Sequence, residues 1–212
     1  MQTLFLLAAV LSAGVFWLRY AGDDASSAGG TTVKTLSTAL LALIALQSGA
    51  PGWVVAGLAL GSLGDFALAR PGTAAFLAGM LAFALGHLAY AGGFASQVTV
   101  LPGAVWPILA AMLGLVAVTA LWIAPKAGAL AWPVRLYAVI IGAMVIAAAA
   151  LPNIAGRGAI LTGVALFAAS DFILAIRLFI LNDPRLRLIG AKVLWPLYWL
   201  GQALILWGAM AA

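Results

Sequence analysis

Cysteine is absent from this chain, so the sequence excludes disulfides and thiolate metal sites. Charge is scarce as well: 7% of the 212 residues are charged, against about 25% in a typical soluble domain. Hydrophobic residues make up 66% of the chain. A soluble fold could not cover its surface with this composition, so lipid must act as the solvent. We therefore expect one all-α integral membrane domain over residues 1–212.

The few charges are mostly basic. Ten Lys and Arg residues face five acidic residues, which gives a formal charge of +5. In a soluble protein such an excess would indicate nucleic-acid binding. Here the basic residues lie mostly at the ends of apolar segments, where they anchor and orient a membrane protein. Nucleic acid is therefore not an expected partner.

A membrane span needs about 20 apolar residues, and the chain offers eight such segments. A polar loop over 21–32, with Asp23 and Asp24, separates the first two segments. Prolines lie at or near most of the breaks, where a missing N–H does least harm. The predicted segments are about 2–20, 33–49, 53–70, 73–93, 103–123, 132–151, 157–180 and 190–210.

The basic residues also predict an orientation. The even-numbered connections between these segments hold only Arg157. The odd-numbered connections hold the other nine: Arg19, Lys34, Arg70, Lys126, Arg135, Arg177, Arg185, Arg187 and Lys192. Because positive charge stays on the cytoplasmic side, we expect the odd connections inside the cell and both termini outside.

One motif occurs twice. Ser62-Leu63-Gly64-Asp65-Phe66 is followed by Leu-Ala three and four residues after the aspartate, and Ala169-Ser170-Asp171-Phe172 repeats this frame. The two aspartates are 106 positions apart, half of the chain. They fall in the third and seventh segments, which run in the same direction. This spacing predicts a pseudo-repeat of four plus four helices, with halves of approximately 1–106 and 107–212.

Each aspartate lies inside an apolar segment, where a carboxylate costs roughly 2.5 to 3.5 kcal/mol. Counted from Arg70 and Arg177, both carboxylates lie roughly 7–9 Å inside the cytoplasmic helix ends. They are expected to share one layer of the bundle. Two close carboxylates do not easily both ionise, so the pair can supply one acid and one base.

Other polar side chains fall in or near this layer. Lys34 opens the second segment, Tyr137 lies in the sixth, and Tyr198 and Gln202 lie in the eighth. His87, the single histidine, and Tyr90 come from the fourth segment. On a straight helix His87 lies roughly 20 Å from the start of its segment, too deep for direct contact with the aspartate layer.

These motifs together resemble the YhhN family. They are Gly64-Asp65, His87-x-x-Tyr90, Ser170-Asp171-x-x-Leu174-Ala175-x-Arg177 and Tyr198-Trp199-x-Gly201-Gln202. The resemblance runs from Lys34 to Gln202, although Thr35 stands where the family often has proline after the lysine. It implies an eight-helix lysoplasmalogenase that hydrolyses the vinyl ether bond of lysoplasmalogens to a fatty aldehyde and a glycerophospho-alcohol. The implied catalytic pair is Asp65 and Asp171.

The residues themselves fit that implication. Vinyl ether hydrolysis needs an acid that protonates the β-carbon, and an anion that stabilises the oxocarbenium ion and activates water. Two aspartates supply both roles, as two carboxylates do in glycosidases, without a metal or cofactor. Lys34 and Arg177 are candidates for binding the phosphate of a lysophospholipid. Tyr137, Tyr198 and Gln202 are candidates for orienting the glycerol or the water.

Each candidate also has a structural interpretation. The aspartates and His87 can form helix-locking hydrogen bonds or ion pairs, and Tyr90, Tyr137 and Tyr198 can be packing residues. Gln202 can join two helices through its amide, and Lys34 and Arg177 can extend to the membrane surface only to set topology. A repeated pair of intramembrane acids favours function over structure.

Two other functions are compatible with the repeat. A small proton-coupled transporter would use paired aspartates near the membrane midplane. Here the residue count places both aspartates nearer the cytoplasmic side. A metal site of Asp65, Asp171 and His87 is disfavoured by the depth of the histidine and the lack of further ligands.

The composition, rich in alanine and glycine, is typical of bacteria, so we expect a multi-pass protein of a bacterial cytoplasmic (inner) membrane, surrounded by membrane lipids.

Overall fold

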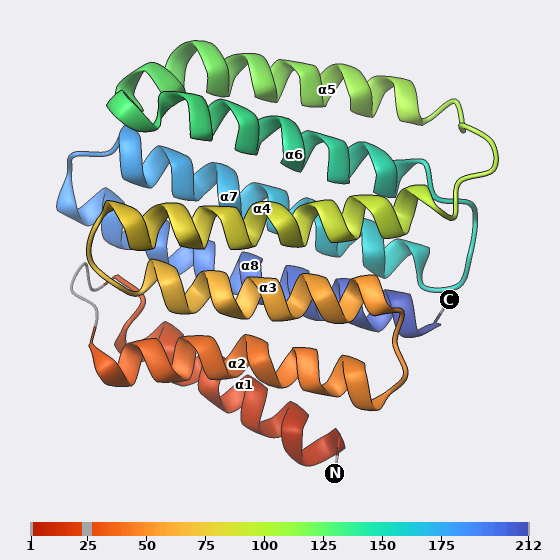
Figure 1. Cartoon of the computed structure of the whole chain (residues 1–212), viewed down its shortest axis with the longest axis horizontal. Coiled ribbons are helices and arrows are strands. Elements are labelled where there is room, and N and C mark those ends of the chain that lie inside the picture. Colours follow the sequence, from red (N-terminus) through yellow and green to blue (C-terminus); the bar gives the residue numbers. More distant parts are fainter. Residues whose placement is uncertain (1, 23–26, 212) are drawn as a thin grey trace.

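A computed structural model describes residues 2–22 and 27–211, and this part of the chain is all-helical with no strand. Helices lie side by side with their axes roughly aligned (Figure 1). Their bounds are α1 Gln2–Arg19, α2 Ala28–Gln47, α3 Gly52–Leu68, α4 Thr73–Ala95, α5 Val105–Val118, α6 Ala131–Ala149, α7 Arg157–Phe179 and α8 Pro184–Ala211.

Two predicted boundaries were wrong. Helix α2 begins at Ala28 rather than near 33, because the Ser27 side chain accepts a hydrogen bond from the Gly30 backbone and caps the helix. Helix α8 begins at Pro184 rather than near 190, since proline suits the first helical turn. The predicted polar loop is thus shorter, and its Asp23 and Asp24 lie outside the described residues.

Six segments of the described chain are long and apolar enough to cross a membrane. One of them, Val105–Ala149, includes both α5 and α6 and the turn between them, and the 17-residue helix α3 is apolar but shorter. Several such segments indicate a multi-pass membrane protein. Eight separate spans, the four-plus-four repeat and the side of the membrane on which the termini lie stay predictions.

The chain reverses between α5 and α6 through an irregular turn. Helix α5 passes into a π-helical turn, Thr119–Ile123, and a 3-10 segment, Ala124–Leu130. Within that segment Gly128 has φ 57° and ψ −122°, a conformation that a residue with a Cβ rarely adopts. Helices α5 and α6 consequently form an antiparallel pair at the edge of the bundle (Figure 1).

Glycines bring the site-bearing helices close together. A Cβ on Gly201 would lie 2.8 Å from the Gly163 carbonyl oxygen, so only glycine lets α7 and α8 approach this closely. In the same way a Cβ on Gly57 would lie 2.4 Å from the Tyr90 ring, which packs against α3. These contacts hold α3 against α4 and α7 against α8, the two tightest pairs in the bundle.

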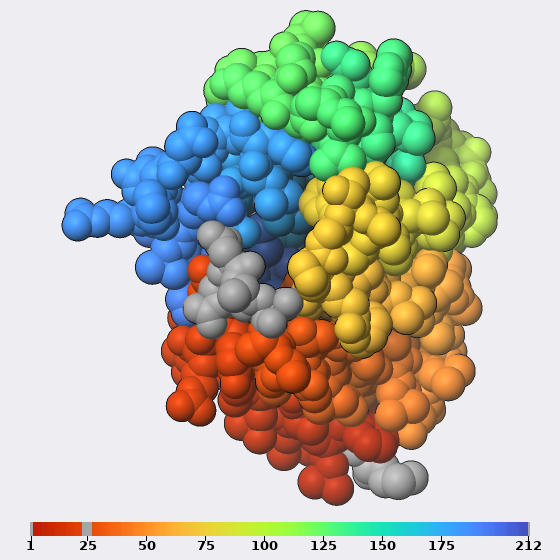
Figure 2. Space-filling model, turned by 60° about the vertical axis from the view of Figure 1, so that its left-hand side comes forward, coloured from red at the N-terminus to blue at the C-terminus, as the bar shows by residue number. Residues whose placement is uncertain are grey.

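The start of α1 and the end of α8 lie toward the same end of the bundle, and the α3–α4, α5–α6 and α7–α8 connections lie at the other (Figure 1). At this second end three cations cover aromatic rings: Arg70 on Phe66, Lys126 on Trp122, and Arg135 on Trp132. Such pairs are typical of a membrane–water interface. Figure 2 views this end, where the surface is hollowed between α7–α8 and the start of α4.

Candidate active site

Asp65 forms the centre of a first polar cluster. The residue lies three positions before the end of α3 and is 1% exposed. The Lys34 ammonium lies 3.3 Å from its Oδ1, while the hydroxyls of Thr38 and Tyr198 donate to its Oδ2 at 2.8 and 2.9 Å. Lys34 and Thr38 are four residues apart on α2 and so share one helix face. Helices α2, α3 and α8 thereby satisfy this buried carboxylate completely.

Asp171 forms a second cluster with α4 and α6. The Tyr137 hydroxyl donates to its Oδ2 at 3.0 Å, and Nε2 of His87 lies 3.1 Å from the same oxygen. His87 is completely buried, and its Nδ1 lies 2.6 Å from the backbone oxygen of Phe83. The prediction that His87 lies too deep to touch an aspartate was therefore wrong.

The depth of the two aspartates explains this contact. Asp171 lies eight residues before the end of α7, whereas Asp65 lies only three before the end of α3. At 1.5 Å per residue Asp171 is more than one helical turn further from its helix end, toward the level of His87. Counting from Arg177 missed this because α7 continues beyond the arginine to Phe179.

Aromatic rings stand between the clusters. The His87 ring contacts Phe167 at 4.5 Å between ring centres, and Phe167 contacts Tyr198 at 5.3 Å. Among the described contacts the two carboxylates share no hydrogen-bond partner. The arrangement is thus two separately partnered carboxylates linked through rings, rather than the directly coupled pair that the sequence favoured.

Tyr90 and Gln202 form a third, deeper contact. The Tyr90 hydroxyl donates to Oε1 of Gln202 at 2.6 Å, and both side chains are completely buried. This bond joins α4 to α8. Nε2 of Gln202 has no hydrogen-bond partner among the described residues and lies beside Gly61 of α3. Gln202 lies four residues, about one helical turn, after Tyr198 on α8.

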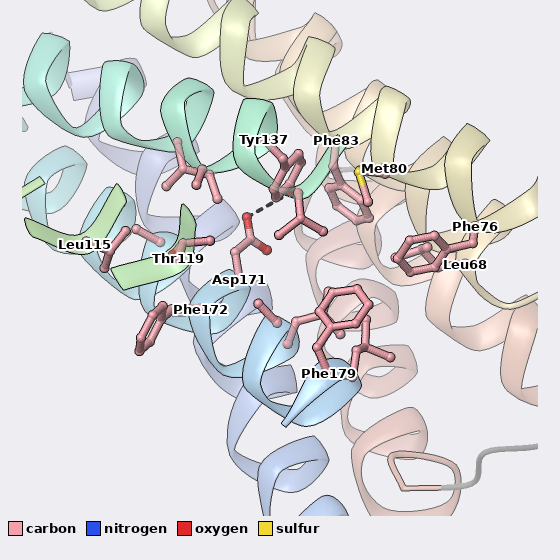
Figure 3. A pocket seen from close by; sticks show the side chains of 17 residues that line it. Leu68, Phe76, Met80, Phe83, Leu115, Thr119, Tyr137, Asp171, Phe172 and Phe179 are labelled. Carbon is pink, nitrogen blue, oxygen red and sulfur yellow. Dashed lines mark hydrogen bonds between the residues drawn. The ribbon is translucent and has the colours of Figure 1, made fainter. Parts of the chain in front are cut away.

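Asp171 lines an apolar pocket between α4, α5, α6, α7 and the end of α3 (Figure 3). Its carboxylate points into this pocket with one oxygen toward Tyr137, and Oδ1 has no hydrogen-bond partner among the described residues. The remaining wall is nearly all hydrocarbon. It includes Leu68, Phe76, Met80, Phe83, Leu115, Thr119, Phe172, Leu174, Leu178 and Phe179.

A second, basic pocket of about 410 Å³ lies beside the first. Its cationic wall comprises Lys34, Arg177 and Arg187. The two pockets share four apolar residues: Leu68, Phe76, Leu174 and Leu178. A molecule with an anionic end and an apolar end therefore meets a matching surface for each, with Asp171 on the apolar side of the shared residues.

The structure brings together most of the predicted site residues and adds one. Lys34, Asp65 and Tyr198 meet in one cluster, and His87, Tyr137 and Asp171 in the other, while Arg177 lies apart from both and lines only the basic pocket. Thr38 was missed, although its position four residues after Lys34 on one helix face could have revealed it. The described residues contain no cluster of three or more His, Cys, Asp or Glu side chains placed to hold a metal, and independence from metals and cofactors stays a prediction.

Comparison with known proteins gives one match. The family model described as the YhhN family matches residues 30–209, which include both aspartate clusters and the walls of both pockets apart from a few residues of α1 and its loop. No curated protein and no solved structure matches the chain. Because the matched range covers most of the sequence, this chain belongs to the YhhN family.

Proposed function

We propose that the protein is a membrane-embedded, lysoplasmalogenase-like hydrolase that cleaves the vinyl ether bond of a lysophospholipid. The observation that carries the proposal is the position of Asp171 in the wall of an apolar pocket that adjoins a basic one. A bacterial cytoplasmic membrane as its location belongs to the same proposal.

The two pockets suit the two ends of such a substrate. In the basic pocket, Lys34 and Arg177 bind the phosphate of the head group by charge-assisted hydrogen bonds. The glycerol and the vinyl ether then pass the shared residues Leu174 and Leu178 and reach Asp171. The apolar pocket has a volume of about 60 Å³, which accepts the first atoms of the alkyl chain, and the rest extends toward the bilayer.

Asp171 acts as the proton donor in this proposal. Its carboxyl group points into the pocket, so the carboxyl proton passes to the β-carbon of the vinyl ether and leaves an oxocarbenium ion. Water adds to the positive carbon, its proton returns to the site, and the hemiacetal collapses to the aldehyde and the free glycerol hydroxyl. Once Asp171 has given its proton to the substrate, the Tyr137 hydroxyl stabilises the resulting carboxylate by donating a hydrogen bond to it.

Asp65 holds the other side of the site. Its ion pair with Lys34 fixes the ammonium at the boundary of the basic pocket, and its bond from Tyr198 fixes the ring that contacts Phe167. Asp65 thus contributes to substrate binding and to the position of the rings between the two clusters, while Asp171 transfers the proton.

The test is aldehyde release from lysoplasmalogen by purified protein in detergent. We expect Asp171→Asn to lower kcat by about 10²- to 10⁴-fold, the usual contribution of a general acid, and Asp65→Asn to lower kcat/KM. Asp183→Asn is the matched control, because Asp183 is an exposed acid in the α7–α8 connection and should leave activity unchanged. A folded, inactive parent protein would refute the proposal.

The alternative is a proton-coupled transporter. Reconstituted vesicles with a pH-sensitive dye distinguish it, since a transporter would move protons with its solute and a hydrolase would not. Proton flux that is lost in both aspartate variants, with no aldehyde formed by the parent, would favour the transporter.

A further inference from the structure

The orientation of His87 carries a further inference about proton transfer. Its Nδ1 lies 2.6 Å from the backbone oxygen of Phe83, four residues earlier on α4. A carbonyl oxygen can only accept, so Nδ1 must carry the hydrogen of this bond. In the neutral ring Nε2 then has no hydrogen and carries a lone pair on the side of the ring nearer Asp171.

This geometry fixes how many protons the His87–Asp171 pair can hold. The Nε2 to Oδ2 distance is 3.1 Å, but the two atoms are not aligned as a hydrogen bond, and Nε2 has no hydrogen-bond partner among the described residues. A nitrogen lone pair and a carboxylate oxygen this close repel each other, and a proton held by either atom removes the repulsion. The contact is oblique to the ring nitrogen, as expected for a catalytic hydrogen bond that tightens only with substrate.

The surroundings leave Asp171 as the natural partner of this proton. The groups that face the pair are the Tyr137 hydroxyl from α6, which donates to the same Oδ2, and the ring of Phe167 from α7. From α8, Tyr198 contacts the far side of this arrangement through Phe167, and its hydroxyl donates to Asp65 of α3. Apart from the contact between His87 and Asp171 themselves, no charged side chain of the described residues contacts His87 or Asp171.

We infer that His87 and Asp171 share a single proton. His87 is the positioning residue, because it holds this proton where Asp171 can donate it. The inference rests on the proposed function for its catalytic half. The proton of the pair goes to the β-carbon of the vinyl ether. The water that adds to the oxocarbenium ion returns one proton to the pair, so the pair ends each turnover as it began.

The single histidine of the chain permits a direct test. In protein labelled with ¹⁵N-histidine, every imidazole signal belongs to His87 and needs no assignment. We expect an Nδ1 signal of a protonated nitrogen over the whole pH range in which the protein is folded. Asp171→Asn should shift the Nε2 signal and leave Nδ1 unchanged. A bare Nδ1, or an Nε2 signal unaffected by Asp171→Asn, would overturn the shared proton.

Activity tests the role of the pair. His87→Asn keeps a donor near Phe83 and loses the group at Nε2, whereas His87→Gln keeps a polar group near Asp171 that cannot exchange a proton. We expect both variants to lose about 10²-fold in kcat with KM changed less than about threefold. Phe94→Leu, a buried change on the same helix, controls for loosened packing. Near-normal kcat in either histidine variant would reduce His87 to a structural role.

The two tests can fail separately. The nuclear magnetic resonance experiment needs no substrate, so it reports on the shared proton even if lysoplasmalogen is not cleaved. An inactive parent with the expected nitrogen signals would refute the substrate and keep the proton pair. An active parent with a bare Nδ1 would keep the hydrolase and refute the pair.

Discussion

The Lys34 ammonium and the Asp65 carboxylate lie 3.3 Å apart, on neighbouring helices α2 and α3. The carboxylate is almost completely buried, while the lysine side chain is 18% exposed toward the basic pocket. An ion pair in this position ties the wall of the basic pocket to the bundle interior, and it makes the two residues interdependent.

We expect Lys34→Met to destabilise the protein by about 3 kcal/mol, because it leaves Asp65 as a buried charge without its counter-ion. The double variant Lys34→Met/Asp65→Asn should recover most of this loss, since neither charge remains. Unfolding of the purified protein in detergent measures both values. A double variant as unstable as the sum of the single changes would show that the ion pair does not govern stability here.

The hydroxyl of Thr38 should matter more than that of Thr35. Thr38→Val removes a donor to a charged acceptor and is expected to cost about 1.5 to 3 kcal/mol. Thr35→Val is the matched control on the same helix, because its buried Oγ1 has no described partner and its loss should be neutral or stabilising. Melting temperatures of the two valine variants make the comparison, and equal losses would contradict it.

A larger side chain among the residues shared by the two pockets should block the passage between them. Leu174→Trp places a large ring among the residues shared by both pockets, so we expect at least a tenfold loss of kcat/KM on lysoplasmalogen with the fold retained. Leu200→Trp makes the same change on an exposed face of α8 and should leave kcat/KM near that of the parent. Unimpaired turnover by Leu174→Trp would mean that substrate does not cross this point.

Alanine substitutions at two glycines distinguish the effect of close helix packing on stability from the effect of helix propensity. Gly201→Ala should destabilise the bundle strongly, because its Cβ meets backbone atoms of α7. Gly114→Ala on α5 has nothing within 4 Å of the new Cβ and should be neutral or stabilising by up to about 1 kcal/mol. Thermal unfolding in detergent ranks the two, and the reverse order would contradict the α7–α8 contact.

The sequence predicted the helices well because apolar runs and their proline breaks are local signals. It also singled out Asp65 and Asp171, since an acid in an apolar segment stands out without any structure. It failed on His87, because depth along a straight helix says nothing about where helices of unequal length begin and end relative to one another. The partition of partners between the two aspartates depends on ring contacts such as His87–Phe167, which no spacing in the sequence encodes.

The pairing of Lys34 with Asp65 has an electrical consequence. Because the two formal charges cancel, the region around the basic pocket presents no net charge from this pair to the membrane field, which is worth about 2.3 kcal/mol per elementary charge at 100 mV. A proton carrier built on these residues would be driven by that voltage. Hydrolysis at this site should instead run at the same rate in polarised and in depolarised vesicles.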